Sequence, residues 1–341
     1  MIGRRWRRGL AVIGLVGLAG AALVASSLWR WWSFQVSTPY RGYLEPMVTV
    51  HIPEGTSVRR IGVLLEEARV VRSAQIFTVY ARLTDGSPLQ AGVYRFDKAE
   101  SLEEVIRKLR RGETLQVRVT IPEGSDLVQI AVILAKERVA QIEDFMEAAA
   151  NPEEIRDLDP QATDLEGYLF PDTYFFPPDV SAPQIVRRMV ANFRRHWKER
   201  FERRTFETGW TVREVVTLAS LIEKETGVPH ERPLVSAVFH NRLRMGMPLM
   251  CDPTVIYAVA LEREFDGIIH RSDLEIDSPY NTYRYPGLPP GPIANPGLAS
   301  IEAALEPADV DYLYFVARGD GGHVFSRTYA EHARAVQRYR N

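Results

Sequence analysis

Apolar positions between Thr211 and Gly227 recur at helical spacing and predict the most distinctive helix of the chain. Thr211 is a suitable N-cap, and Glu214, three residues later, completes a capping box. Gly227 fits the left-handed position that often ends a helix. The pattern therefore predicts a largely buried helix that carries two acids, Glu223 and Glu225, to its C-terminal end. Its apolar stripe consists of Val215, Val216, Leu218, Ala219 and Ile222.

A second pattern occurs twice before this helix: a short β-rich strand, a Pro-Glu-Gly turn and an amphipathic helix. The turns Ile52–Gly55 and Ile121–Gly124 lie 69 residues apart (121 − 52). A strand-like segment at 91–96 and a capped helix at 101–111 lie between them. The pattern predicts a small α/β module, for which a glycan-binding role and a spacer role are equally open.

The remainder of the chain combines helices with long loops rich in proline, glycine and tyrosine. Helices are expected at 183–206 and from Pro233 to Gly246, and a hairpin around 319–322 precedes a terminal helix. Long ordered loops of this kind are usually functional. Six aromatic residues are candidates to line a cleft in which sugar faces stack, and half of them are expected to be ordinary core: Tyr168, Phe170, Tyr174, Tyr280, Tyr283 and Tyr285.

The N-terminus predicts a single membrane anchor. Arginines at positions 4, 5, 7 and 8 precede an uncharged run over 9–29, about long enough to cross a bilayer as a helix. This charge distribution predicts a cytoplasmic N-terminus, an anchor at 10–32 and an extracytoplasmic body. The alternative is a signal peptide cleaved near Val24–Ser26.

Composition excludes several classes of protein. Hydrophobic content of 45% and charged content of 25% are typical of globular domains, and a net charge of −2 gives no indication of nucleic-acid binding. The single cysteine, Cys251, cannot form an internal disulfide and is expected to be a packed small side chain. The sequence contains neither a CxxC nor an HExxH motif, so no metal site is predicted, and no cofactor is expected.

The two acids of the predicted helix are candidates for proton transfer. The negative end of the helix dipole and partial burial both raise the pKa of a carboxyl there, as a general acid near neutral pH requires. Residues two apart differ by about 200° around a helix, so Glu223 and Glu225 flank the apolar stripe on opposite sides. Glu225 lies slightly nearer its centre. The alternative is that both acids belong to a solvated face.

Several long motifs in order resemble the endolytic murein transglycosylase family (MltG, YceG-like), over about 48–339 and including the anchor. They are EGYLFPDTY, ASLIEKET, VFHNRLRMGMPL, DPTVIYA, GLPPGPIANPG, LYFVA and GDGGHVFS. The resemblance implies that Glu225 is the catalytic acid, with Thr226 in the place of the serine of the Glu-Ser pair in other lytic transglycosylases. One departure is Met250–Cys251, where many relatives have Gln-Ser or Gln-Thr.

The resemblance also implies the organisation of the chain and its fold class. We expect an α+β protein with a cytoplasmic tail at 1–9, a transmembrane helix at 10–32, a linker at 33–47, a LysM-like α/β module at 48–118 and a catalytic region at 119–341. The core of the catalytic region is expected at about 160–341 and to contain a lysozyme-like catalytic helix. The implied location is the inner membrane, with the catalytic region in the periplasm.

The activity implied by the resemblance is cleavage of the MurNAc–GlcNAc bond within peptidoglycan strands, giving 1,6-anhydro ends and terminating nascent strands. Partners are glycan strands and, by the same resemblance, peptidoglycan synthases or division proteins. Glu223 is the second candidate for the acid. Candidate substrate-positioning residues are Thr226, Glu166, Tyr168, Asp252, Asn281 and Tyr283.

Three other functions remain open from sequence. One is a non-catalytic glycan-binding or division-scaffold protein in which the helix acids are structural. Another is a pyridoxal-phosphate lyase that uses Lys224, although no phosphate-binding motif accompanies it. The third is a hydrolase with Glu225 as acid and Glu223 as base, which their opposite directions on one helix disfavour.

Overall fold

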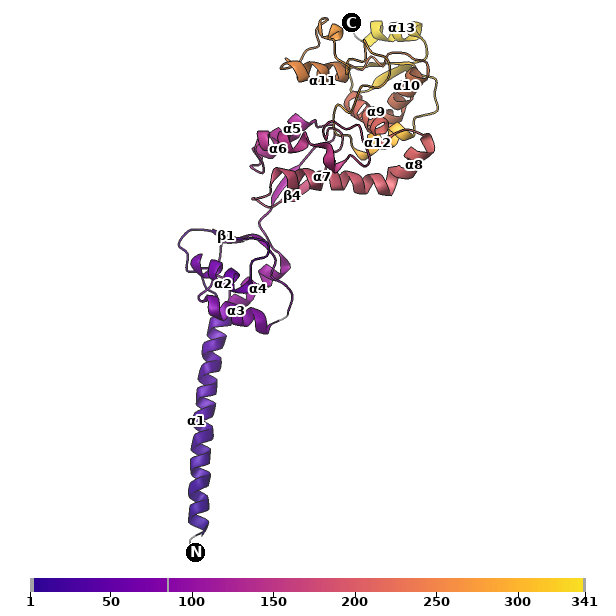
Figure 1. Cartoon of the computed structure of the whole chain (residues 1–341). Helices are drawn as coiled ribbons and strands as arrows, with labels where there is room; N and C mark the ends of the chain where they lie inside the picture. The colour runs from indigo at the N-terminus through magenta and orange to yellow at the C-terminus, as the bar shows by residue number, and fades with distance from the viewer. Residues whose placement is uncertain (1–2, 85, 340–341) are drawn as a thin grey trace. The chain divides into compact units, whose positions relative to one another are not determined.

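The computed structural model describes residues 3–84 and 86–339 and combines helices with small two-stranded sheets (Figure 1). It divides into two compact units. The first extends to Gln116 and includes 177–179, and the second contains 117–176 and the chain from Val180 onward. The expected mixed α+β class is therefore confirmed.

The first unit has the order helix, strand, two helices, strand and helix. Strands β1 and β2 pair antiparallel, with Val50 opposite Tyr94. Their inward-facing residues form one core with Leu65, Phe77 and Ile106 from the helices. The elements are α1 (Gly3–Ser37), β1 (Val48–Ile52), α2 (Val58–Glu67), α3 (Ala74–Leu83), β2 (Gly92–Phe96) and α4 (Leu102–Arg111).

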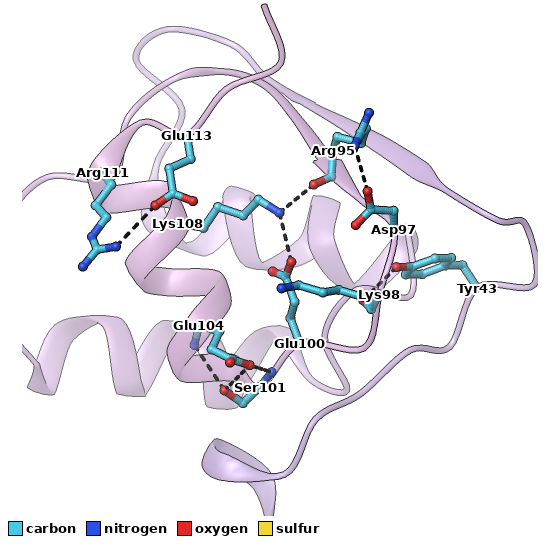
Figure 2. Close-up of polar contacts among 10 residues, drawn as sticks. All are labelled: Tyr43, Arg95, Asp97, Lys98, Glu100, Ser101, Glu104, Lys108, Arg111 and Glu113. Carbon is cyan, nitrogen blue, oxygen red and sulfur yellow. Dashed lines mark hydrogen bonds and ion pairs between the residues drawn. The ribbon is translucent and has the colours of Figure 1, made fainter.

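Polar contacts fix α4 against β2 in this unit (Figure 2). Ser101 and Glu104 form a capping box, in which the Ser101 amide donates to Glu104 at 2.7 Å. At the other end, the Lys108 ammonium donates to Glu100 at 3.0 Å and to the Arg95 carbonyl at 2.6 Å. Because Glu100 and Lys108 are largely buried, this ion pair positions the helix on the sheet.

The predicted anchor at 10–32 falls within α1. No helix among the described residues has both the length and the apolar character that crossing a membrane requires. The side chains at 3–14 and at 16 lie outside what the structure describes, and part of the predicted anchor is among them. The anchor therefore stays a prediction.

The second unit is mainly helical and has two small antiparallel sheets, β3 with β4 and β5 with β6. The helix expected over 183–206 is present as α7 and α8, with a π-helical turn at Trp197–Phe201 inserted between them. The hairpin expected around 319–322 is present as β5 and β6. The elements are β3 (Val117–Thr120), α5 (Leu127–Lys136), α6 (Ile142–Ala149), β4 (Thr173–Phe176), α7 (Ala182–His196), α8 (Glu202–Thr208), α9 (Val212–Glu225), α10 (Arg232–Arg244), α11 (Asp252–Glu262), α12 (Leu298–Leu305), β5 (Tyr314–Ala317), β6 (His323–Ser326) and α13 (Tyr329–Tyr339).

Helix α9 is the centre of this unit, with α10, α11 and α12 packed around it (Figure 1). Its apolar stripe is fully buried, and each valine, leucine or isoleucine side chain in it contributes about 1.5–3 kcal/mol. The predicted capping box is present, because the Thr211 amide and hydroxyl both donate to Glu214 at 2.8 Å. A rigid central helix therefore carries Glu223 and Glu225.

The predicted end of α9 is wrong in one respect. The helix stops at Glu225, and Thr226 already has an extended backbone (φ −142°, ψ 129°). The Thr226 hydroxyl then accepts a hydrogen bond from the Val228 amide at 3.0 Å. This local turn redirects the chain without a left-handed residue, so Gly227 does not adopt the positive φ that its position predicts. Glu225 is therefore the last residue of the helix.

Candidate active site

Glu225 lies partly buried at the C-terminal end of α9, beside the start of α11. Burial raises the pKa of its carboxyl to about 7, and the nearby negative charge of Asp252 adds to the rise. A hydrogen bond from the Cys251 thiol and the positive charge of Arg242 act in the opposite direction. Glu225 thus exchanges its proton near neutral pH, which is the property that sequence analysis required of a general acid.

A hydrogen-bonded turn fixes Cys251 beside this carboxyl. The Cys251 amide donates to the Thr282 hydroxyl at 3.0 Å, and its carbonyl accepts from the Thr254 hydroxyl at 2.6 Å. Met250, the preceding residue, has a left-handed backbone (φ 51°), which is uncommon for a residue with a side chain. Cys251 is fully buried, as expected, but its thiol also contacts Glu225. Sequence analysis missed this second role.

Asp252 and Tyr283 form a pair next to Glu225. The Tyr283 hydroxyl donates to the Asp252 carboxylate, and burial together with that contact raises the pKa of Tyr283. Asn281 holds the backbone at Tyr283, because its side-chain oxygen accepts a hydrogen bond from the Tyr283 amide at 3.0 Å. The Asn281 amide group donates to the Leu274 and Ile276 carbonyls, each at 3.0 Å. Asn281 therefore shapes the loop that presents Tyr283.

Arg242, on α10, is a further neighbour of Glu225 that sequence analysis did not identify. Its guanidinium donates to the carbonyls of Leu313 at 2.7 Å and Leu249 at 2.8 Å, and it lies over the Tyr314 ring at 5.2 Å. Backbone carbonyls thus hold a largely buried cation near the carboxyl of Glu225. The only signal for it was an arginine on a helix face that is otherwise apolar.

Glu223, the second candidate for the acid, points away from Glu225. One of its oxygens accepts from the Arg232 guanidinium at 3.1 Å, and the other accepts from the Gly297 amide at 2.9 Å. Its side chain is 6% exposed. The Glu223 carboxylate therefore ties α9 to α10 and to the start of α12.

The Thr226 hydroxyl donates toward Glu231 at 3.5 Å. Glu231 in turn accepts from the His323 ring at 2.7 Å and from the His323 amide at 2.9 Å. All three side chains are largely buried. The described contacts of Thr226 thus connect the turn after Glu225 to the β5–β6 hairpin.

Glu166 and Tyr168 lie in the interior. Glu166 accepts from the Asn295 side chain at 2.9 Å and from the Leu127 amide at 3.1 Å, and burial raises its pKa to about 8. Tyr168 is 1% exposed, and its hydroxyl donates to Asp159 at 2.6 Å. The structure therefore gathers Asp252 and Tyr283 at Glu225, while Glu166 and Tyr168 join buried parts of the fold.

No group of three or more His, Cys, Asp or Glu side chains in the described part of the chain has an arrangement that could hold a metal ion.

Comparison with known proteins identifies the family of the chain. The model of the YceG-like family matches residues 50–338. The chain belongs to the YceG-like family. Among similar proteins, the endolytic murein transglycosylase of Bacillus subtilis (strain 168) is 38% identical over 310 residues, covering 86% of this chain and 84% of that protein.

The endolytic murein transglycosylase of Streptococcus pneumoniae serotype 2 is 32% identical, in an alignment that covers 97% of this chain and 64% of the streptococcal protein. Among solved structures, a yceG-like protein of Listeria monocytogenes aligns with a TM-score of 0.59 and 36% identity. That alignment covers 85% of this chain and 98% of the Listeria chain.

Proposed function

We propose that this chain is a lytic transglycosylase, a carbon–oxygen lyase that cleaves peptidoglycan glycan strands internally, with Glu225 as its catalytic acid. Its YceG-like family membership and the name endolytic murein transglycosylase, which both relatives carry, support the reaction class. The observation that carries the assignment of Glu225 is its pKa of about 7 at the end of a rigid helix. At neutral pH this carboxyl is protonated in a large share of molecules and can both give and take a proton.

A single carboxyl is sufficient for this reaction, because the substrate supplies its own nucleophile. Protonated Glu225 donates its proton to the glycosidic oxygen between N-acetylmuramic acid and N-acetylglucosamine, and that bond breaks as positive charge builds on the muramic ring. The Glu225 carboxylate then takes the proton from the C6 hydroxyl of the same ring. The C6 oxygen closes on C1, which leaves a 1,6-anhydro end and consumes no water.

The neighbours of Glu225 have different roles in this proposal. Asp252 keeps the pKa of Glu225 high and places negative charge near the developing positive charge on the sugar. Tyr283 orients Asp252, and Asn281 orients Tyr283. Arg242 limits the rise in the pKa of Glu225. We assign Thr226, Glu166 and Tyr168 to supporting the fold around the site rather than to contact with substrate.

The contacts of Glu223 and Lys224 disfavour two of the alternative functions. Both oxygens of Glu223 accept hydrogen bonds on the side opposite Glu225, so Glu223 does not serve as the base of a hydrolase. The Lys224 ammonium donates to the Gly124 carbonyl at 3.1 Å and is thereby held against the turn before α5. A non-catalytic scaffold remains the alternative that experiment must exclude.

We further propose that the chain is anchored in the inner membrane by its N-terminal segment, with the catalytic unit in the periplasm. The arginines at positions 4, 5, 7 and 8 and the uncharged run that follows support this orientation. Described apolar side chains on α1 such as Leu18, Leu23 and Trp29 are largely exposed, as expected for a helix surrounded by lipid. Fusion of a reporter active only outside the cytoplasm to the C-terminus tests the orientation.

The proposal also assigns a role to the first unit and partners to the enzyme. We assign a LysM-like, glycan-binding role to the β1–α4 unit, and we expect the anchored enzyme to act beside peptidoglycan synthases or division proteins. Deleting residues 48–116 tests the first assignment, because binding to sacculi should weaken. Binding that is unchanged after the deletion would make this unit a spacer.

The decisive experiment uses the detergent-solubilised full chain, as wild type, Glu225→Gln and Glu223→Gln. Each is incubated with uncrosslinked glycan strands, and the products are analysed by mass spectrometry. Internal fragments with 1,6-anhydro ends from wild type and Glu223→Gln, but not from Glu225→Gln, support the proposal. Reducing ends one water heavier would make the enzyme a hydrolase, and bound but intact strands would make it a scaffold.

A further inference from the structure

A cavity of about 560 Å³ lies beside the beginning of α9, at the end of the helix opposite Glu225. Its volume is within the range of about 300–1,000 Å³ that is usual for small-ligand sites. Thr217 on its wall precedes Glu225 by eight residues, which corresponds to about 12 Å along the helix axis. Among its lining residues are Gln161, Trp210, Arg213, Glu214, Thr217 and Leu288.

Thr217 is the clearest sign that this cavity takes a polar ligand. Its side chain is 1% exposed, and its hydroxyl has no hydrogen-bond partner among the described residues. A buried hydroxyl without a partner destabilises the folded protein, since it loses its bonds to water on folding. Because this hydroxyl is closed off from the cavity, a ligand with a hydroxyl or an amide supplies the missing partner only if the wall around Thr217 adjusts on binding.

Arg213 presents a polar group whose position is fixed in advance. Its Nε donates to the Pro290 carbonyl at 2.6 Å, and Nη1 donates to the buried Asp159 carboxylate at 2.7 Å. Nearby, Glu214 uses one carboxylate oxygen, Oε2, in the capping box of α9. The amide of Gln161 adds both a donor and an acceptor. The lining of the cavity therefore offers both donors and acceptors.

Other residues of the lining are apolar. Trp210 is partly buried, and its ring packs on the His240 ring at a centroid distance of 4.9 Å, which fixes its orientation. Leu288 and Pro289 continue this surface. An aromatic ring beside fixed donors and acceptors suits a ligand with an apolar face and a rim of hydroxyls, because each part of the ligand then has a matching partner.

We propose that this cavity is an accessory saccharide subsite that binds one N-acetylhexosamine ring of a glycan strand away from the point of cleavage. The identity of the ligand as part of a peptidoglycan strand rests on the proposed function. A pyranose ring stacks one face on Trp210, while its hydroxyls and acetamido group bond to Thr217, Arg213 and Gln161. Binding there holds a long strand across the enzyme and favours internal over terminal cleavage.

The test measures binding of chitin tetrasaccharide, an oligomer of N-acetylglucosamine, to the full chain by isothermal titration calorimetry. Glu225→Gln is the background, so that no cleavage intervenes. We expect Trp210→Ala to weaken binding about tenfold, as the loss of one stacked ring predicts. Phe206→Ala, which removes an aromatic ring that is 86% exposed on the neighbouring α8, serves as the matched control and should bind like the background variant.

Thr217→Val separates ligand recognition from folding. Valine keeps the shape of threonine and removes the unpartnered hydroxyl, so the melting temperature should stay the same or rise. Affinity for the tetrasaccharide should nevertheless fall roughly fivefold, because the ligand loses one hydrogen bond. Reduced binding by a protein that is no less stable cannot be attributed to misfolding.

Any of three results would overturn the subsite. They are undetectable binding of the tetrasaccharide to the background variant, equal affinities of Trp210→Ala and Phe206→Ala, and unchanged affinity in Thr217→Val. Its failure is distinguishable from failure of the proposed function. Strand cleavage by wild type with tetrasaccharide binding insensitive to Trp210 rejects the subsite alone. Binding that depends on Trp210, with no cleavage by wild type, rejects the lyase and retains the saccharide site.

Discussion

The thiol of Cys251 hydrogen-bonds the carboxyl of Glu225, although the two residues are 26 positions apart (251 − 225). The contact stabilises the ionised carboxylate and opposes the effect of burial, which acts to keep the carboxyl protonated. Because a thiol is a weak donor, the opposition is partial and the pKa of Glu225 stays near 7. Cys251 is thus a positioning residue for the carboxyl that we propose as the catalytic acid.

The first prediction concerns the identity of residue 251. Cys251→Ser introduces a stronger donor and should lower the pKa of Glu225, whereas Cys251→Ala removes the donor and should raise it. A general acid is active when protonated, so activity falls as pH rises through its pKa. The alkaline limb of the kcat/KM profile should therefore move to lower pH in the serine variant and to higher pH in the alanine variant.

The measurement is kcat/KM on glycan strands between about pH 5 and 9, where the free enzyme's acid controls the alkaline limb. Thr254→Ser, a conservative change that keeps the hydroxyl bonded to the Cys251 carbonyl, is the matched control and should leave the limb in place. Limbs that coincide in the serine and alanine variants would show that the thiol does not set the protonation of Glu225.

The second prediction links Glu225 to stability. Its folded-state pKa of about 7 is above its ordinary value of 4.5, so the folded protein binds more protons than the unfolded chain between these values. The free energy of unfolding therefore declines as pH rises through this window. Glu225→Gln cannot ionise, so it should unfold with the same free energy as wild type at pH 4 and with roughly 1–3 kcal/mol more at pH 8.

Urea denaturation of both proteins at the two pH values checks this expectation. A Glu225→Gln variant with the same advantage at pH 4 as at pH 8 would mean that the gain comes from packing and not from titration. The result bears directly on catalysis, since an acid that destabilises its own fold when ionised is in an environment that retains its proton.

Local pattern predicted the start of α9 well and its end poorly. The capping box of Thr211 and Glu214 lies within four residues of sequence, so the pattern contained everything that determines it. The end of the helix depends on the Thr226 hydroxyl bonding the Val228 amide, one of several turns open to such a sequence. The position of Gly227 alone did not distinguish between these turns.

The candidate site was likewise predicted only in part from the sequence. Helical spacing placed Glu223 and Glu225 on opposite sides, and the structure confirms this. The contact of Cys251 with Glu225 and the role of Arg242 were not predicted, because these residues reach Glu225 from a loop and from another helix. Contacts with the carbonyls and hydroxyls of distant residues hold them there. Contacts of this kind have no periodicity in the sequence.

The third prediction concerns the buried pair of Glu223 and Arg232, whose side chains are 6% and 10% exposed. Glu223→Ala leaves the Arg232 charge without its partner and should lower the free energy of unfolding by about 3–5 kcal/mol. The double variant Glu223→Ala, Arg232→Met removes both charges and should recover part of that loss. Urea denaturation of the single and double variants gives the coupling energy, and a double variant as unstable as the sum of the two single changes would exclude coupling between them.

The fourth prediction concerns Glu231 and His323, which connect the turn after Glu225 to the β5–β6 hairpin. Burial alone would raise the pKa of Glu231, but hydrogen bonds from the His323 amide and ring lower it overall. A carboxyl with a lowered pKa contributes stability at neutral pH that is lost as pH falls through that pKa. His323→Ala should therefore lower the free energy of unfolding by about 2 kcal/mol at pH 7, and by less at pH 3.

The same variant should also slow the reaction, because Glu231 contacts Thr226, the residue that follows Glu225. A displaced carboxyl loses transition-state stabilisation more than substrate binding, so kcat should fall about tenfold while KM changes little. His323→Gln keeps a side-chain N–H donor and should recover part of both losses. A His323→Ala enzyme that is destabilised but keeps its kcat would restrict this pair to folding, and Glu225 would then owe its position to α9 and Cys251 alone.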